Sequence, residues 1–320
     1  MEDLLIALRA AAEPTRLRVL SLAAQGMFCA GDFTEILDQS QPRLSRHLKL
    51  LVEAGLLARL REGAHVWFGL PEGAGGSLAR EIVARLPAEE PVLEADRRQA
   101  ARVLAERARI ATETFRKQGA DWDEMRALDL PAAEVERILA EVLRGPNLGR
   151  LIDIGTGTGR VLELLAPRIS AGLGIDASPA MLSLARARLS RPEFAHCAVR
   201  RADMYRLPLA DGSFDAAVLQ MVLHHAEAPE AVIAEAARVL KPHGRLVIVE
   251  LEAHAQGSLT QKLAHRWTGF AADRLGNMMR HAGLMPDGPV KVAGKLPLLV
   301  WSATRLAAPA AASPALHATL

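Results

Sequence analysis

Three glycines at alternate positions follow a strand-like apolar run in the segment LIDIGTGTGR, residues 151–160. Gly155, Gly157 and Gly159 permit a sharp turn, and their missing Cβ atoms let a ligand approach the main chain. The helix-forming run RVLELLAPRI follows directly, and the free N–H groups at the start of a helix attract an anionic or electron-rich group. This segment therefore predicts a ligand-binding turn between a strand and a helix.

Three carboxylates lie close to the ends of the strands predicted around this turn. Asp153 precedes the first glycine, Asp176 ends the second strand in GLGIDASPAML, and Asp203 ends the third in RRADMYRLPL. Asp176 can accept both hydroxyls of a ribose, Asp203 can hold a purine amino group, and Asp153 can anchor the loop or a ligand amino group. A dinucleotide fingerprint would place its third glycine one residue later. A ribose, a base and a cationic amino acid tail together favour S-adenosylmethionine over NAD.

Residues 151–250 resemble class I S-adenosylmethionine-dependent methyltransferases, in the branch that includes the ubiquinone-biosynthesis C-methyltransferases. The resemblance rests on LIDIGTGTGRVLELLA, GIDASPAMLSLAR, ADMYRLPLADGSFDAAVLQMVLHH and EAARVLKPHGRLVIVE. It implies S-adenosylmethionine as cofactor, or S-adenosylhomocysteine as bound product or effector. The residues expected in the cofactor site are Asp153, Gly155, Gly157, Asp176, Ala177, Asp203, Met204 and Gln220.

The segment FRKQGADWDEMR, residues 115–126, resembles the helical lead-in that often covers the cofactor pocket of such enzymes. Trp122 is the expected cofactor contact there, because it is a large side chain in a stretch of small residues. Burial of Trp122 in ordinary helix packing is the alternative.

Methyl transfer from a sulfonium is an in-line displacement, and alignment of the two reacting groups can supply roughly 7–11 kcal/mol of the acceleration. The reaction therefore requires no fixed catalytic side chain. His224 and His225 nevertheless end a predicted strand on the ligand-binding rim and are candidate general bases. Packing or hydrogen bonding at the rim is the alternative for both, and Tyr205 is a similarly placed candidate for substrate contact.

The first part of the chain, over nearly all of residues 4–70, resembles the winged helix-turn-helix of ArsR-family bacterial repressors. Pro42 suits the first turn of a helix that Ser40 can cap. Leu44, Leu48 and Leu51 would face the core at helical spacing, and the wing-like RLREGAHVWF follows. Polar and basic residues on the other faces can contact bases and phosphates: Ser40, Gln41, Arg43, Ser45, Arg46, His47 and Lys49.

This resemblance implies a dimer that reads palindromic double-stranded DNA. Leu4, Leu5, Leu8 and Ala12 supply more apolar surface than one small domain needs to cover. Many ArsR-family proteins bind metals through a Cys-x-Cys pair, but here Gly31 stands where the partner of Cys29 would be. One thiol is a weak site for a thiophilic metal, so we expect no metal.

Composition divides the chain into four parts. We expect an α+β winged helix-turn-helix in 1–72, a helical linker and cofactor lid in 73–146, a Rossmann-like doubly wound α/β domain in 147–306, and a disordered tail in 307–320. The strands of a parallel sheet are predicted at 150–155, 171–177, 195–203, 214–221, 244–251 and 296–305.

Apolar runs of the length that spans a membrane, about 18 residues, are absent from the sequence. Two cysteines cannot form a disulfide framework, and the acidic start lacks a secretion signal, so a cytoplasmic location is expected. The sequence predicts a DNA-binding regulator whose methyltransferase domain acts on an unidentified small molecule. In the alternative, that domain only senses S-adenosylmethionine or S-adenosylhomocysteine and sets the DNA affinity.

Overall fold

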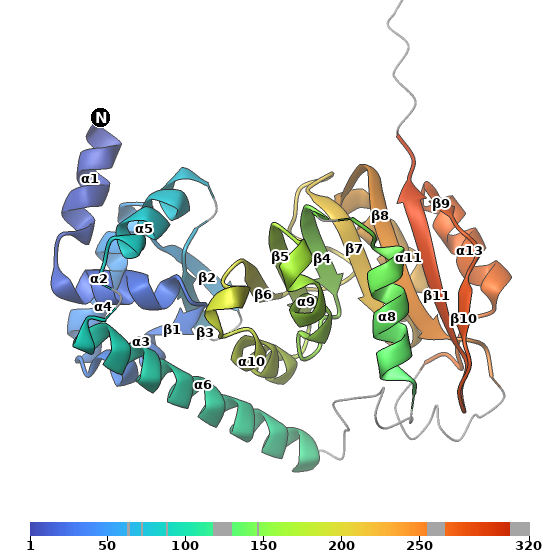
Figure 1. Ribbon diagram of the computed structural model, residues 1–320, viewed down its shortest axis with the longest axis horizontal. Helices are drawn as coiled ribbons and strands as arrows, with labels where there is room; N and C mark the ends of the chain where they lie inside the picture. Colours follow the sequence, from blue (N-terminus) through green and yellow to red (C-terminus); the bar gives the residue numbers. More distant parts are fainter. Residues whose placement is uncertain are drawn as a thin grey trace, which may run out of the picture.

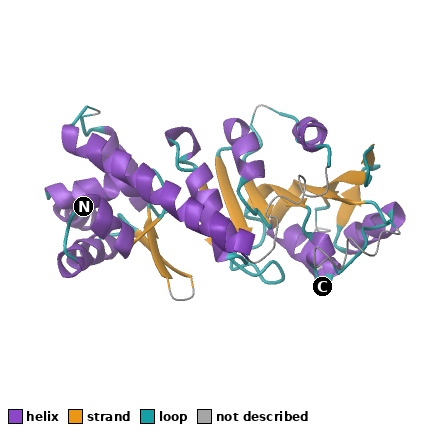
Figure 2. Ribbon diagram, turned by 90° about the horizontal axis from the view of Figure 1, so that it is seen from below, coloured by secondary structure: helices purple, strands orange, loops and turns teal. Residues whose placement is uncertain are grey.

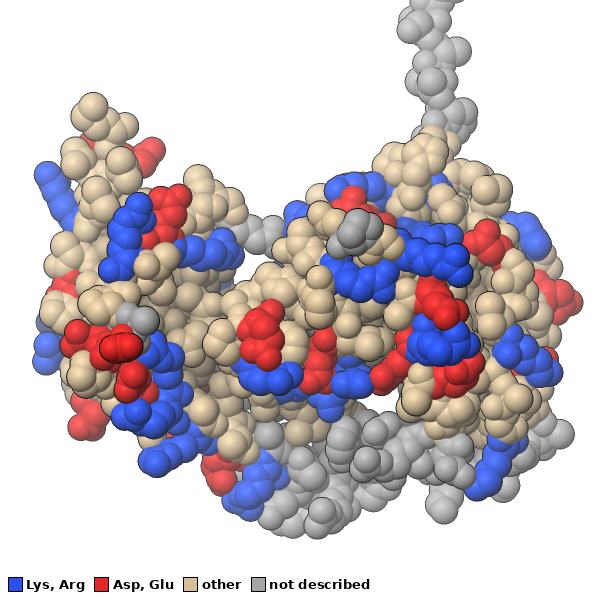
Figure 3. All heavy atoms as spheres, viewed as in Figure 1, with Lys and Arg blue, Asp and Glu red and all other residues tan. Residues whose placement is uncertain are grey.

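The computed structural model describes residues 1–62, 65–71, 73–87, 89–117, 130–145, 147–254 and 266–307. Two sheet-containing parts lie at opposite ends of the molecule, and one long helix, α6 (Pro91–Lys117), runs along both (Figure 1). Basic and acidic side chains are interspersed over the face seen in Figure 3, in keeping with a formal net charge of only +2.

The N-terminal part is a winged helix-turn-helix, as expected. Its three strands form an antiparallel sheet in the order β1-β3-β2, and α3 and α4 pack together as the helix-turn-helix pair. The β2–β3 hairpin forms the wing. The elements are α1 (Glu2–Ala11), α2 (Pro14–Ala23), β1 (Phe28–Cys29), α3 (Ala30–Leu37), α4 (Gln41–Glu53), β2 (Ala58–Glu62) and β3 (His65–Gly69).

Local sequence signals explain where these helices begin. Glu13 precedes α2 and accepts a hydrogen bond from the backbone N–H of Arg16 at 2.9 Å. Asp32 accepts from the backbone N–H of Cys29 at 2.7 Å and so closes a capping box at the start of α3. In α4 the three leucines at positions 44, 48 and 51 are buried, as their spacing predicts.

The helical stretch expected as a linker is divided between the two parts. Helix α5 (Ala74–Ala84) and the first half of α6 complete the N-terminal core, and α8 (Ala132–Val142) joins the core of the C-terminal part. Arg18 of α2 binds Asp96 of α6 through two hydrogen bonds of 2.7 and 2.6 Å. Figure 2 shows the long helix α6 running from the N-terminal part toward the second part.

The C-terminal part contains a sheet in the order β10-β11-β8-β7-β4-β5-β6, with β9 paired to β11. Its strands are β4 (Arg150–Ile154), β5 (Ala171–Asp176), β6 (Cys197–Arg201), β7 (Phe214–Gln220), β8 (Leu240–Leu251), β9 (Leu284–Pro286), β10 (Val290–Val292) and β11 (Leu298–Arg305). Strands β4 to β8 are parallel.

The prediction of a wholly parallel sheet is wrong for β11, which runs antiparallel to β8 with Val300 opposite Val249. An apolar strand buried on both faces has the same pattern in either direction, so the sequence could not decide its orientation. An antiparallel edge strand on an otherwise parallel sheet is common.

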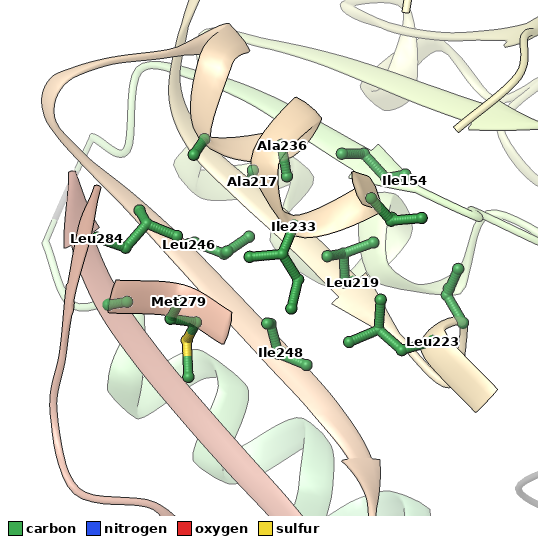
Figure 4. Close-up of a cluster of buried hydrophobic side chains, with 14 of the residues drawn as sticks. Ile154, Ala217, Leu219, Leu223, Ile233, Ala236, Leu246, Ile248, Met279 and Leu284 are labelled. Atoms are coloured by element: carbon green, nitrogen blue, oxygen red, sulfur yellow. The ribbon is translucent and has the colours of Figure 1, made fainter. Parts of the chain in front are cut away.

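Helices cover both faces of this sheet, as in a doubly wound fold. One face packs against α8, α9 (Arg160–Leu165) and α10 (Pro179–Arg188), and the other against α11 (Pro229–Val239) and α13 (Ala272–His281). Alternate residues of a strand enter opposite cores: Val247 and Val249 enter the first, and Ile248 enters the second. Figure 4 shows the second core, where Ile233 and Met279 meet strand residues.

Candidate cofactor and DNA-binding sites

The order of the strands places a topological switch point between the neighbouring strands β4 and β7. Strands β5 and β6 lie on one side of β4, and β7 and β8 lie on the other. The connections therefore leave in opposite directions from β4 and β7, and ligands of doubly wound folds bind at the carboxyl ends of strands at such a switch point. The glycine turn follows β4 at this point.

Gly155 and Gly157 of the turn have different surroundings. Gly155 has φ +74°, and a Cβ added there would lie 2.4 Å from Cγ2 of Val222. Gly157 has φ +51°, but a Cβ there would meet no atom within 4 Å. The first glycine therefore permits close packing of the turn, whereas the second has open space beside its backbone where a ligand can approach.

The carboxylate of Asp176, at the end of β5, connects this turn to the next helix. Its Oδ2 accepts a hydrogen bond from the N–H of Gly157 at 2.9 Å, and its Oδ1 accepts from the N–H of Ser178 at 2.8 Å. Burial raises the pKa of Asp176. A carboxylate oxygen can accept more than one hydrogen bond, so Asp176 can also receive ribose hydroxyls.

Asp153 lies beneath the turn, near the end of β4, and is only 1% exposed. Its Oδ2 accepts a hydrogen bond from Oγ1 of Thr156 at 2.6 Å. Burial, with a smaller contribution from the charge of Asp176, raises the pKa of Asp153 to about 7. Two carboxylates whose charges burial disfavours are suited to a ligand that brings positive charge.

Gln220 ends β7, the neighbour of β4, and its side chain has an acceptor at this edge that is unpaired within the described part of the chain. Its side-chain Oε1 is buried without a hydrogen-bond partner among the residues that the structure describes. Buried polar atoms are seldom left unpaired, so a donor from a bound ligand fits here. The open backbone at Gly157, the paired acids and this acceptor are compatible with S-adenosylmethionine, which carries a ribose, hydroxyl donors and cationic groups.

The remaining predicted cofactor residues follow β5 and β6 at the same edge of the sheet. Ala177 is exposed, and its carbonyl accepts a hydrogen bond from Nε of Arg201 at 3.2 Å. Asp203 is exposed and accepts from the N–H of Tyr205 at 3.0 Å, whereas Met204 is half-buried against the sheet core. Contact of these residues with adenosine stays a prediction.

The two candidate histidines lie in a short 3-10 turn, η3 (Leu223–His225), and differ in their surroundings. His224 is fully buried, and its Nδ1 lies 2.6 Å from Oε1 of Glu250. His225 is exposed, with its ring centroid 4.2 Å from that of His224. His224 therefore helps to hold the turn in place. Of the two histidines, only His225 is accessible to a substrate. General-base catalysis by His224 or His225 stays a prediction.

Glu250 of β8 organises this turn and was not among the predicted site residues. It is fully buried and accepts hydrogen bonds from the backbone N–H groups of Leu223 and Leu251, both at 2.9 Å. The sequence signal that could have identified Glu250 is its position as a single acidic residue inside the apolar run LVIVEL. Tyr205 also has a positioning contact, because its hydroxyl accepts from the N–H of Glu227 at 2.6 Å.

Most of the predicted DNA-contacting residues lie on the exposed side of α4. The exposed members are Ser40, Gln41, Arg43, Ser45, Arg46 and Lys49. His47 differs, because its side chain is only 13% exposed and its Nδ1 lies 3.5 Å from Oε2 of Glu13. Ser40 occupies the N-cap position of α4, but its side chain makes no capping hydrogen bond there. Base or phosphate contact by this surface stays a prediction.

Trp122 and most of the expected lid, residues 118–126, lie outside the described residues, as does the tail from residue 308. Within the described ranges, no helix is both long and apolar enough to cross a membrane.

Comparison with protein families adds two matches. Residues 13–59 match the bacterial regulatory protein family of ArsR type, and residues 152–248 match a methyltransferase domain. The chain joins an ArsR-family helix-turn-helix domain to a methyltransferase domain. Helix α4 lies inside the first match, and the glycine turn lies inside the second.

Two similar proteins are demethylmenaquinone methyltransferases. The demethylmenaquinone methyltransferase of Tropheryma whipplei strain Twist is 39% identical over 100 residues, which are 31% of this chain and 41% of the relative. That of Thermotoga maritima is 37% identical over 116 residues, 35% of this chain and 48% of the relative. The chain thus spans less than half the length of these relatives.

A solved structure supports the fold of the methyltransferase domain. It is a chain from the complex between the Haloferax volcanii Trm112 methyltransferase activator and a protein described as a methyltransferase. The TM-score is 0.50 at 19% identity, over 61% of this chain and 97% of that chain.

Proposed function

We propose that this protein is a cytoplasmic, dimeric, DNA-binding transcriptional regulator whose methyltransferase domain transfers a methyl group from S-adenosylmethionine to a small molecule. The observation that carries the enzymatic half is the arrangement of Asp176, which hydrogen-bonds the glycine turn and the start of α10 at once. A ribose bound by this carboxylate would lie beside the open backbone of Gly157. The exposed basic and polar side of α4 supports the regulatory half.

The chain's own contribution to methyl transfer would be binding and alignment. S-adenosylmethionine supplies, when bound, an electrophilic methyl group on a sulfonium. In this proposal Asp176 holds the ribose, Asp153 the amino group and Gln220 a further donor of the cofactor. Alignment alone can account for roughly 7–11 kcal/mol of the barrier. His225, the exposed histidine of η3, is the group best placed to accept a proton from the substrate.

The cofactor half is tested by calorimetry and by transfer. One molecule of S-adenosylmethionine or S-adenosylhomocysteine should bind per chain, and NAD should not bind. The protein is then incubated with methyl-labelled S-adenosylmethionine and the small-molecule fraction of a lysate. Labelled product that requires the protein supports an enzyme, and binding without transfer to any fraction contradicts it.

The DNA half is tested with a duplex selected by the wild-type protein from a random-sequence pool. Arg43→Ala and Arg46→Ala should each weaken binding, and a phosphate contact should lower the salt slope by about 1 per residue lost. Arg137→Ala is the matched control, because Arg137 is an exposed arginine of α8 in the methyltransferase domain. Failure to select any duplex would contradict DNA reading.

The sensor function is the second candidate, and one observation favours it. Helix α6 packs against α2 and α3 of the ArsR-type domain and against α10 of the methyltransferase domain. A ligand that shifts α10 can therefore bias the DNA-binding domain without any transfer of a methyl group. A change in DNA affinity with S-adenosylhomocysteine, in the absence of transfer, would support the sensor.

A further inference from the structure

A buried arginine–tryptophan pair joins the two domains. Arg186 of α10 lies over the ring of Trp67 in β3, with Cζ 3.8 Å from the ring centroid. The two residues are only 8% and 9% exposed. Attraction between a guanidinium and an aromatic face strengthens when water is excluded, so this pair is a specific contact rather than a chance approach of two surfaces.

Trp67 belongs to the middle strand of the wing sheet. It lies opposite Leu60 of β2 and Cys29 of β1. Its neighbour Phe68 is part of the ArsR-type core. Since successive strand residues point to opposite faces, Trp67 faces the methyltransferase domain. The sheet that carries the wing is thus held between its own core and α10.

Arg186 belongs to the helix that begins at the proposed ribose site. The N–H of Ser178, which is the N-cap of α10, donates to Asp176. The glycine turn touches the same helix further along, because a Cβ added to Gly159 would lie 3.2 Å from Cβ of Ala185. Two parts of the proposed cofactor site therefore contact α10, one at its first turn and one beside Arg186.

We propose that α10 transmits the occupancy of the cofactor site to the wing through the contact of Arg186 with Trp67. This inference rests on the proposed function, because transmission needs an adenosyl ligand to bind, and its effect on affinity needs DNA to bind as well. Closure of Asp176 and the glycine turn on a ribose moves α10, and the arginine–tryptophan pair carries that movement to β3. The two ligands then bind with coupled affinities, and coupling between two sites is commonly 5- to 150-fold.

Substitution of Arg186 removes its contact with the ring of Trp67. Arg186→Met keeps most of the aliphatic stem and removes the guanidinium. Arg191→Met is the matched control, because Arg191 lies 4.6 Å over the ring of Phe194 entirely within the methyltransferase domain. Arg186→Lys, which keeps the charge and loses the planar group, is the second variant in case the first does not fold.

DNA affinity is measured by fluorescence anisotropy on the selected duplex, with and without saturating S-adenosylhomocysteine. Wild type and Arg191→Met should each show a change of at least about fivefold. In Arg186→Met the ligand-dependent change in DNA affinity should fall below twofold. In Arg186→Lys the logarithm of this change should fall by about half. The affinity of both variants for S-adenosylhomocysteine, measured by calorimetry, should stay within twofold of the wild-type value. An undiminished ligand effect in the folded Arg186 variants would overturn the inference, as would its equal loss in Arg191→Met.

Amide hydrogen exchange separates this inference from the proposed function. S-adenosylhomocysteine should slow exchange in residues 58–62 and 65–69 of the wild type, and not in Arg186→Met. If S-adenosylhomocysteine binds but no DNA duplex is selected, the proposed DNA-binding function is wrong. Slowed exchange in the wing would then still support transmission through α10. A wing whose exchange ignores the bound ligand overturns the inference even where both ligands bind. Absence of ligand binding removes the cofactor proposal and this inference together.

Discussion

Replacement of Asp153 by Asn should remove a specific pH dependence of stability. The carboxyl is 1% exposed, and burial raises its pKa from 3.8 to about 7. The folded state therefore holds a proton that the unfolded chain releases at lower pH. Between about pH 4 and pH 7 the folded state binds more protons, so the free energy of unfolding falls as the pH rises.

The size of the effect follows from the pKa difference. A shift from 3.8 to about 7 corresponds to about 4 kcal/mol at 1.36 kcal/mol per pKa unit. Asn has nearly the same shape and can still accept the hydrogen bond that Asp153 receives from Oγ1 of Thr156. The difference in unfolding free energy between Asp153→Asn and wild type should therefore change by about 4 kcal/mol in favour of Asn from about pH 4 to pH 8.

Urea unfolding of the ligand-free full chain at a series of pH values measures this difference. Variants are compared at the same pH, so ionisations that they share cancel. Asp3→Asn is the control, because Asp3 is exposed in the first turn of α1. A difference between Asp153→Asn and wild type that is the same at both ends of the pH range would refute a protonated, buried Asp153.

Three further predictions concern the ligand, the turn and the assembly. Asp176→Ala removes a charge-assisted hydrogen-bond partner worth about 1.5–3 kcal/mol, so calorimetry should show roughly 10- to 150-fold weaker S-adenosylhomocysteine binding; an unchanged affinity would argue against a ribose at this carboxylate. Glu250→Leu leaves the buried His224 and the N–H of Leu223 without their acceptor, and should cost about 3 kcal/mol, seen as a lower melting temperature, with Glu250→Gln milder; equal melting temperatures would contradict the positioning role. Light scattering should give twice 34.4 kDa, because Leu4, Leu5 and Leu8 of α1 are 45–49% exposed; a monomer at micromolar concentration would exclude the dimer.

The sequence by itself determined the local features whose cause is local. The spacing of Leu44, Leu48 and Leu51 places them on one face of any helix, and they are buried in α4. The alternate glycines after an apolar run specify a turn, and all three adopt positive φ. The ends of β4, β5 and β7 were predicted to within one residue, because glycines, acidic residues or other polar residues interrupt the apolar runs there.

Only the tertiary structure decided what depends on contacts between distant segments. It placed the helices of 73–146 in two different cores. The sequence could not predict this, because an amphipathic pattern indicates that one face of a helix is buried but does not identify the element that buries it. It turned β11 antiparallel, turned His47 toward Glu13 and buried His224 against Glu250. It also placed Arg186 on Trp67, a pair that are 119 positions apart and that no local pattern connects. Hydrophobic periodicity and turn residues depend on neighbours in the sequence. The direction of a strand, the contact partner of a side chain and its burial depend on how the whole chain packs.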